Sequence, residues 1–165
     1  MRISQFQKYS QKENTVTNNV LLMLSRLNDL NNNYYKSIIE FLNEGSQQEY
    51  HSQPIFSQQV KAKNGIIDGH IEVKPSKIII ETKLNSTEVI GKLVKYGKSF
   101  KEGYQNQLWH LSSVKFTVDE EKQIDKQLKE LYPELSIQFN NLLFIDLIDN
   151  LNGISEENPH DSQLK

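Results

Sequence analysis

The sequence predicts an α+β domain in which helices flank a mixed β-sheet. Two observations lead to this prediction. Apolar residues recur at helical spacing in the N-terminal third, and the pattern then changes to short β-branched runs separated by turn signals. Three such runs in succession, followed by a strand–helix–strand crossover, require a sheet with both antiparallel and parallel pairs. The expected order of elements is α, α, β, β, β, α, β, α, β.

Two helices are expected first. Apolar residues between positions 16 and 27 follow the helical period, and Ser10 with Glu13 three residues later has the pattern of a capping box. Three asparagines at residues 31–33 end this helix, and a second helix is expected over residues 34–44. These helices would supply one apolar layer of the domain.

Strand and helix signals alternate in the rest of the chain. The turn signals are the pair Asn64 and Gly65 and the four residues 74–77. Strands are expected over residues 54–61, 66–73, 77–84, 107–114 and 142–148. Helices are expected from Asn85 to a stop at Gly103 and over residues 118–131. Residues 150–165 are polar and are expected to form a flexible tail or a linker to further domains. The folded domain is therefore expected over residues 1–149.

Composition excludes several classes of chemistry. The chain of 165 residues has no cysteine, which excludes disulfides, thiolate metal sites and cysteine nucleophiles. No apolar run approaches the roughly 20 residues of a membrane span, and the N-terminus lacks the apolar stretch of a secretory signal. The glycine-rich phosphate-binding motifs and the nucleophile elbow are also absent. We therefore expect a cytoplasmic protein without membrane contact.

Charge is distributed unevenly along the chain. Residues 61–101 carry nine lysines against four acidic residues, whereas residues 102–165 have a net charge of −7. A basic middle segment is typical of a surface that binds phosphates, although a solvated helix face has the same composition. Lys92, Lys95 and Lys98 are the candidates for contacts with nucleic-acid phosphates.

A charged pair ends the most apolar run of the chain. Glu81 and Lys83 follow the isoleucines at residues 78–80. Residues two apart in a strand share a face, so these two side chains point the same way, about 7 Å apart along the strand. Charge beside a buried run costs free energy unless it is paired or functional.

The neighbouring strand is expected to supply a second carboxylate. If residues 74–77 form the turn, Asp68 lies opposite Lys83, and His70 lies opposite Glu81. All four side chains then share one face of the hairpin. Two adjacent carboxylates can bind a hard divalent cation, and a lysine can stabilise charge that develops on a phosphoryl group. The structural alternative is an exposed cross-strand ion pair of little energetic weight.

This stretch resembles the PD-(D/E)XK phosphodiesterase superfamily, whose restriction-endonuclease-like core has the order α-β-β-β-α-β. Asp68 matches the family aspartate, Glu81 the acidic residue of the second motif, and Lys83 its lysine. Glu13 resembles the acidic residue that many members carry on the first helix. Ile67 departs from the family pattern, because proline often occupies this position. The chain would add an extra helix and strand to the core.

The resemblance implies roles for these residues. Asp68 and Glu81 would bind Mg²⁺, with Mn²⁺ as a substitute, and Lys83 would assist the attacking water. Glu13 would orient the water or metal-bound solvent, but the bond of a capping box explains this residue equally well. His70 and Gln107 are candidate neighbours of the site. A solvent-facing strand position is the alternative for His70.

We therefore expect a metal-dependent deoxyribonuclease that leaves a 5′-phosphate. DNA is expected as the substrate rather than RNA, and endonuclease rather than exonuclease action. The chain would be a homodimer or larger oligomer, or the effector domain of a larger bacterial defence or restriction protein. Two alternatives stay open. One is a nucleic-acid-binding domain without catalysis, and the other is a protein-interaction module that uses the acidic C-terminal third.

Overall fold

A computed structural model describes residues 12–43, 52–62, 65–84, 89–158 and 160. In chain order the elements are α1 (Lys12–Leu30), α2 (Asn32–Leu42), β1 (Ile55–Ala62), β2 (Gly65–Val73), β3 (Ser76–Lys83), α3 (Ile90–Lys95), the 3-10 helix η1 (Tyr96–Ser99), β4 (Gln105–Ser112), α4 (Val118–Leu131), β5 (Ile137–Leu143) and α5 (Phe144–Glu157). None of the helices in these ranges is long and apolar enough to cross a membrane.

The five strands form one mixed sheet in the order β1-β2-β3-β4-β5, which confirms the predicted fold class. β1, β2 and β3 pair antiparallel, whereas β3–β4 and β4–β5 are parallel pairs. Each parallel pair is joined by a crossover helix, α3 with η1 for the first and α4 for the second. Crossovers of this kind are right-handed, so two successive ones in the same direction place both helices on one face of the sheet.

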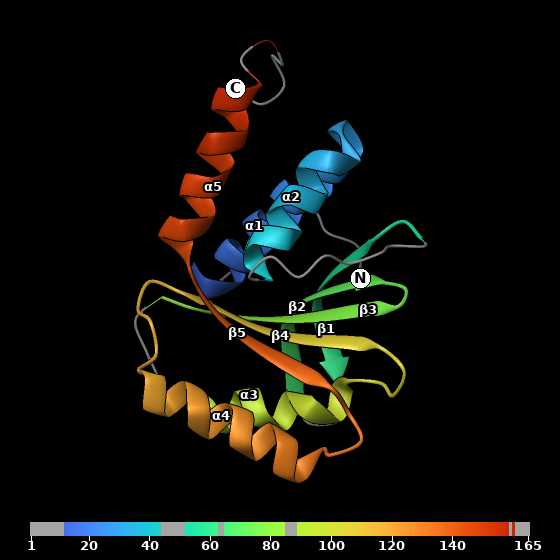
Figure 1. Cartoon of the computed structure of the whole chain (residues 1–165), viewed down its shortest axis with the longest axis vertical. Helices are drawn as coiled ribbons and strands as arrows, with labels where there is room; N and C mark the ends of the chain where they lie inside the picture. Colours follow the sequence, from blue (N-terminus) through green and yellow to red (C-terminus); the bar gives the residue numbers. More distant parts are fainter. Residues whose placement is uncertain (1–11, 44–51, 63–64, 85–88, 159, 161–165) are drawn as a thin grey trace.

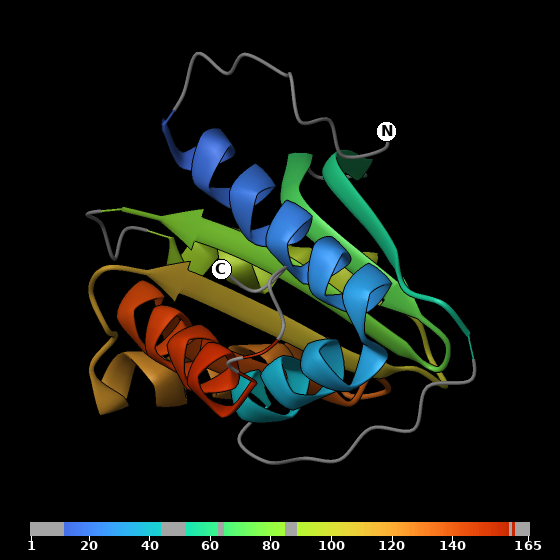
Figure 2. The same cartoon turned by 90° about the horizontal axis from the view of Figure 1, so that it is seen from above.

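Helices cover both faces of the sheet (Figures 1 and 2). The α1/α2/α5 face packs against Ile78, Ile80 and Trp109. The α3/α4 face packs against Ile79 and Leu108. β3 is buried along almost its whole length, because it lies in the middle of the sheet between two helical layers. The polar side chains that β3 carries are therefore held in a dry environment.

Local signals explain where two of the helices begin. The Asn31 side chain accepts a hydrogen bond from the backbone amide of Asn33 and caps α2. Thr117 and Glu120 form a reciprocal capping box at the start of α4. The helix predicted over residues 118–131 is found with those bounds.

The register of the β2–β3 hairpin differs from the prediction. Val73 pairs with Ser76, so the turn consists of Lys74 and Pro75 and not of four residues. Proline has no amide hydrogen and fits the turn, whereas Ser76 can join the hydrogen-bonded ladder. The shift is two residues, so every side chain keeps its predicted face and only its cross-strand partner changes.

The C-terminal region also differs from the prediction. The strand expected over residues 142–148 ends at Leu143, and the chain continues directly as α5. Residues 150–157, which we expected in a tail, belong to this helix. Leu147 and Ile154 are buried in the core of the α1/α2/α5 face, seven residues apart, which is two helical turns. Packing against the core therefore stabilises a helix here, although the local sequence pattern also fits a strand.

Candidate active site

Two carboxylates meet on the α3/α4 face of the sheet. The regular β2–β3 ladder ends with Gly69 opposite Ile80, and one step further along both strands lie Asp68 and Glu81. The two carboxyl groups share a hydrogen bond, and the backbone of Thr82 also hydrogen-bonds the Asp68 carboxyl. The predicted pairs of Asp68 with Lys83 and of His70 with Glu81 are therefore wrong. The register instead brings the two acidic residues together.

Glu81 is completely buried and has two hydrogen-bond donors from the helical layer. The Lys92 ammonium lies 2.6 Å from Glu81 Oε1, and the Tyr96 hydroxyl donates to Oε2 over 2.7 Å. Lys92 Nζ also lies 3.8 Å from Asp68 Oδ2, so one ammonium serves both carboxylates. Lys92 and Tyr96 are four residues apart and lie on one helix face, with Nζ 5.6 Å from the ring centroid.

Burial controls the protonation of this pair. Loss of hydration and the neighbouring charge of Glu81 together raise the pKa of Asp68 from 3.8 to about 7, while Lys92 opposes the shift. Burial together with Glu81 also raises the pKa of the Tyr96 hydroxyl, which stays a proton donor. Near neutral pH the Asp68 carboxyl is therefore partly protonated, and one ammonium, that of Lys92, lies beside both carboxyl groups.

The donor set of this pair fits a hard divalent cation. Mg²⁺ in enzymes is typically held by one or two carboxylates, with water and substrate phosphate as its other ligands. Asp68 and Glu81 supply such carboxylate oxygens side by side, in a place that already attracts a positive charge. No cluster of three or more histidine or acidic residues that could hold a metal lies within the described part of the chain. A cation here would thus depend on substrate or solvent ligands.

Lys83 and Glu13 are two further predicted site residues. Lys83 ends β3 on the same face as Glu81 and is partly exposed. Glu13 lies in the first turn of α1, but its side chain is outside the described part of the structure. The Ser10 of the predicted capping box is likewise outside it. The roles assigned to Lys83 and Glu13 remain predictions.

α1 is held closely against the strands that carry the carboxylates. The hydroxyls of Thr17 and Thr82 form a short hydrogen bond between α1 and β3. The buried Gln58 donates to the Asn14 carbonyl of α1 over 2.8 Å. A side chain at Gly69 would place its Cβ 3.0 Å from the Thr17 methyl group, so glycine permits this close approach. The first turns of α1 are thereby fixed next to β2 and β3.

His70 lies on the same face as Asp68 but belongs to another cluster. Its neighbours are Glu72, with Nε2 to Oε2 at 3.9 Å, and the ammonium groups of Lys77 and Lys101. Burial and the charge of Lys77 together lower the pKa of His70 from 6.5 to about 4. His70 is therefore neutral at pH 7. It is mostly buried and not solvent-facing.

Gln107 does not join the carboxylate pair. It pairs with Ile78 on β3 and thus lies on the α1/α2/α5 face, whereas Glu81 lies on the other face. The side chain is buried in that position. The sheet itself separates Gln107 from Asp68 and Glu81.

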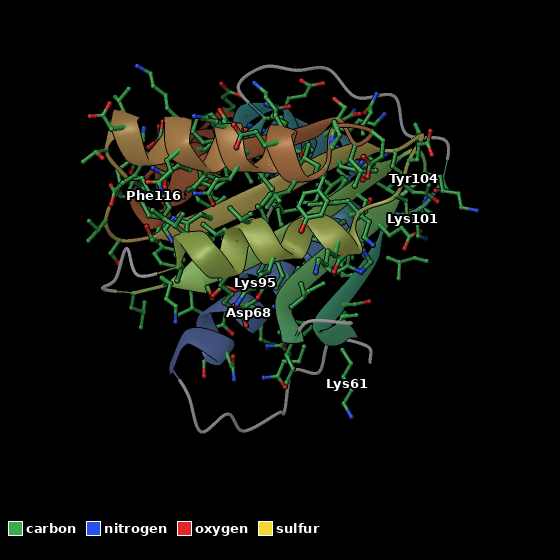
Figure 3. The ribbon with its side chains drawn as sticks, turned by 90° about the horizontal axis from the view of Figure 1, so that it is seen from below. Lys61, Asp68, Lys95, Lys101, Tyr104 and Phe116 are labelled. Carbon is green, nitrogen blue, oxygen red and sulfur yellow. The ribbon has the colours of Figure 1, made fainter. Side chains whose placement is uncertain are left out.

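The lysines of α3 and η1 form an exposed row beside the carboxylate pair. Lys95 and Lys98 are both exposed to solvent. Figure 3 looks onto this side of the molecule, with Asp68 beside α3 and Lys95 on the helix. Lys101 and Tyr104 lie together farther from Asp68, where the Lys101 ammonium is 5.3 Å from the ring centroid. The row offers positive charge to an anion that approaches the pair.

Sequence reasoning missed the direct partners of Glu81. It assigned Lys92 to phosphate contacts only and assigned no role to Tyr96. The spacing of four residues between them was a usable signal, because it places both polar groups on one helix face. His110, which pairs with Glu81 on β4, gave no comparable signal.

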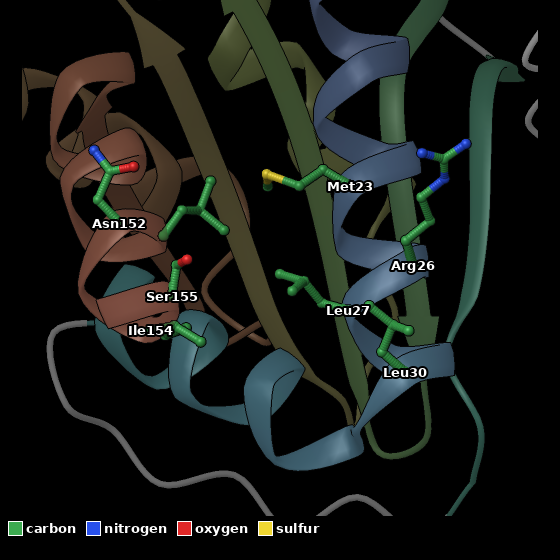
Figure 4. Close-up of a pocket in the computed structure, with 8 residues that line it drawn as sticks. Met23, Arg26, Leu27, Leu30, Asn152, Ile154 and Ser155 are labelled. Carbon is green, nitrogen blue, oxygen red and sulfur yellow. The ribbon is translucent and has the colours of Figure 1, made fainter. Parts of the chain in front are cut away.

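A separate pocket lies on the opposite face of the sheet. It has a volume of about 350 Å³ and opens between α1 and α5 (Figure 4). Its lining residues are Met23, Arg26, Leu27, Leu30, Leu151, Asn152, Ile154 and Ser155. The sheet separates this mainly apolar pocket from Asp68 and Glu81, so it is not part of the candidate active site.

No protein-family model and no curated protein matches the chain. Among solved structures, the chain is similar to SfsA of Pyrococcus furiosus, which was solved in complex with Ca²⁺. The sequences are 15% identical, the TM-score is 0.37, and the match covers 66% of this chain. It spans 53% of the length of SfsA.

Proposed function

We propose that the chain is a metal-dependent nuclease domain that hydrolyses DNA phosphodiester bonds. The observation that supports this function best is the contact between Asp68 and Glu81 on neighbouring strands, beside a row of lysines. Two adjacent buried carboxyl groups are costly for stability, since burial removes their hydration and the charge of Glu81 disfavours a second charge on Asp68. Such an arrangement is typical of a site that binds a cation and does chemistry.

Asp68 and Glu81 would hold Mg²⁺, or Mn²⁺ as a substitute. When bound, the cation would polarise a phosphoryl oxygen and lower the pKa of a bound water. Tyr96 keeps the Glu81 carboxylate in a fixed orientation through its hydrogen bond. Lys92 is the resting counter-charge of the pair, and its side chain is 43% exposed, so it can turn outwards toward a substrate phosphate.

Lys83 would stabilise the negative charge that develops on the phosphoryl group and assist the attacking water. The water oxygen forms the new bond to phosphorus, and the bond to the 3′ oxygen breaks, which leaves a 5′-phosphate and a 3′-hydroxyl. Glu13 is the candidate for orienting that water. Lys95 and Lys98, with Lys92, would contact the phosphates of DNA without reading its sequence. A cytoplasmic location fits this activity.

Cleavage of supercoiled plasmid and of linear DNA tests the proposal. The assay compares Mg²⁺, Mn²⁺ and EDTA for the wild-type chain and for the variants Glu81→Ala and Lys83→Ala. Nicking that requires the cation and is lost in both variants is the expected result. The matched control is Glu72→Gln, which removes a carboxylate from the same sheet face but away from the pair, and which should cleave like the wild type.

Calorimetric titration with Mn²⁺ separates the outcomes. If the wild-type chain binds DNA but does not bind Mn²⁺ and does not cleave, the nuclease proposal is overturned. That result would favour a nucleic-acid-binding domain without catalysis. A folded chain without affinity for DNA at moderate salt would favour a protein-interaction module instead. Linear DNA with blocked ends then distinguishes endonuclease from exonuclease action, and a matched RNA tests the preference for DNA.

A further inference from the structure

His110 on β4 is a buried histidine next to the candidate active site. It is 0% exposed, and its register partner on β3 is Glu81, so both lie on the α3/α4 face. Its ring packs on Phe116 with the centroids 4.4 Å apart. A histidine in such a position must satisfy two ring nitrogens without access to bulk water.

One ring nitrogen is held by a chain of hydrogen bonds. His110 Nδ1 lies 3.1 Å from Asn141 Oδ1, and the Asn141 amide nitrogen donates to Glu121 Oε1 over 2.8 Å. The amide oxygen can only accept, so Nδ1 carries the hydrogen. Nε2 is then the unprotonated nitrogen with a free lone pair. This is the arrangement in which neighbouring groups fix the tautomer of an imidazole at a functional site.

The lone pair on Nε2 has no hydrogen-bond partner within the described part of the chain. A buried acceptor without a donor costs free energy. Lys83 lies two residues beyond Glu81 on the same face of β3. Ser112 is the residue on β4 that pairs with Lys83, and its hydroxyl donates a hydrogen bond to the Val114 carbonyl. Diagonal neighbours on a sheet face are within reach of a long side chain.

The electrostatics agree with this geometry. Burial lowers the pKa of His110, and the nearby positive charge of Lys83 lowers it further, while the bond to Asn141 opposes the shift. The imidazole therefore stays neutral at pH 7. A neutral acceptor can hold an ammonium group without competing for the divalent cation through negative charge.

We infer that His110 is a positioning residue of the proposed nuclease: when Mg²⁺ binds Asp68 and Glu81, His110 Nε2 accepts a hydrogen bond from the Lys83 ammonium and holds it beside the carboxylates. The cation takes over carboxylate oxygens that otherwise hold the Lys92 ammonium, and the neutral His110 offers Lys83 an acceptor on the same face. The inference rests on the proposed function, because it requires the divalent cation.

Long-range ¹H–¹⁵N correlation spectra of the imidazole rings test the bond directly. The samples are the full chain with and without Mg²⁺, as wild type and as Lys83→Met, with Lys126→Met on the far surface of α4 as the control. We expect an unprotonated Nε2 in His110 whose resonance moves on addition of Mg²⁺ in the wild type and in Lys126→Met. It should not move in this way in Lys83→Met. The same Nε2 response in all three proteins would overturn the inference.

Cleavage kinetics test the functional consequence. His110→Phe keeps the packing on Phe116 but removes the acceptor nitrogen. We expect kcat to fall about 10- to 100-fold, which is typical when a residue that orients a catalytic group is lost, and KM to stay unchanged. His110→Gln retains an acceptor oxygen and should recover most of the loss. Equal losses in both variants would indicate a packing role and overturn the inference.

Calorimetry on the same samples separates this inference from the proposed function. If the wild type does not bind Mg²⁺, the nuclease proposal fails and the role of His110 fails with it. If Mg²⁺ binds and DNA is cleaved, but the Nε2 resonance does not respond and His110→Phe cleaves like the wild type, only the role of His110 is overturned.

Discussion

Asp68 and Glu81 lie next to each other on neighbouring strands, and their carboxyl groups share a hydrogen bond in a mostly buried position. The charge of Glu81 and this hydrogen bond both raise the pKa of Asp68. The relationship follows from the two-residue turn at Lys74 and Pro75, which aligns the two acidic residues across the hairpin. It leads to predictions about stability, metal binding and activity.

The first prediction concerns stability against pH without metal. The pKa of Asp68 is raised to about 7, so the folded state holds a proton that the unfolded chain has lost above pH 4. The stability contributed by protonated Asp68 is fully present below pH 4 and is lost as the pH rises through about 7. Asp68→Asn should therefore be more stable than the wild type at pH 8, by about 1–3 kcal/mol, but not at pH 4.

Urea unfolding in EDTA at the two pH values measures this difference. The comparison uses the difference between variant and wild type at each pH, because other groups titrate equally in both proteins. A difference that stays the same between pH 4 and pH 8 would contradict the raised pKa of Asp68.

The second prediction concerns Lys92, the resting counter-charge of the pair. Lys92→Met leaves the buried Glu81 without its cation and should destabilise the chain by about 2 kcal/mol or more in EDTA. Mn²⁺ should restore more stability in this variant than in the wild type, because it supplies the missing positive charge. Thermal unfolding with and without Mn²⁺ measures both effects.

Lys95→Met is the matched control for Lys92→Met. Lys95 lies on the same helix and is exposed, so its removal should leave the melting temperature in EDTA nearly unchanged. If the two variants lose the same stability, the contact between Lys92 and Glu81 has no energetic weight in solution.

The sequence predicts most of the sheet because strand signals are local. The isoleucines of residues 78–80 and the turn residues after Val73 mark the hairpin, and alternation of side chains places Asp68 and Glu81 on one face. The cross-strand partner of each residue depends on the length of the turn. The observed turn is two residues shorter than the predicted one, and a change of two residues leaves every side chain on the same face of the sheet. Turns of two and four residues were both compatible with the sequence, so the register required the structure.

The site partners depend on tertiary packing and could be predicted only in part. Lys92 and Tyr96 reach Glu81 because the crossover after β3 lies over the strand that carries it. Nothing in the local sequence indicates this alignment. α5 was missed for a related reason, since its apolar residues fit a strand over a short window and a helix over a longer one.

The third prediction uses the packing of η1 against α4. A Cβ at Gly97 would lie 2.0 Å from Tyr132 Cε2, and this ring is buried in the core of the α3/α4 face. Gly97→Ala should therefore destabilise the chain by about 1–3 kcal/mol, because the ring and the helix must move apart. Denaturant unfolding measures the loss.

Gly91→Ala is the control for Gly97→Ala. Gly91 lies in α3, and a Cβ there meets nothing within 4 Å. Alanine has the higher helix propensity, so this variant should gain about 0.5–1 kcal/mol. Opposite signs for the two variants are the expected result, and a loss of similar size in both would show that the helix and not the contact with Tyr132 determines the effect.

The last prediction concerns His70, which the structure separates from the carboxylate pair. Its pKa is lowered to about 4 by burial and by Lys77, with Lys101 acting in the same direction and Glu72 opposing. Below pH 6.5 the unfolded chain takes up a proton that folded His70 does not. The stability contributed by neutral His70 is therefore present above pH 6.5 and is lost as the pH falls through about 4.

His70→Gln removes this titration and keeps a polar side chain of similar size. We compare the free energy of unfolding of the variant with that of the wild type at each pH. When the pH falls from 7.5 to 4.5, this difference should shift by about 1–2 kcal/mol in favour of the variant. DNA cleavage at pH 7.5 should be unchanged, because His70 contacts Glu72 and not Asp68 or Glu81. If cleavage fell while stability at pH 7.5 stayed the same, His70 would belong to the active site, and its assignment to a separate cluster would be wrong.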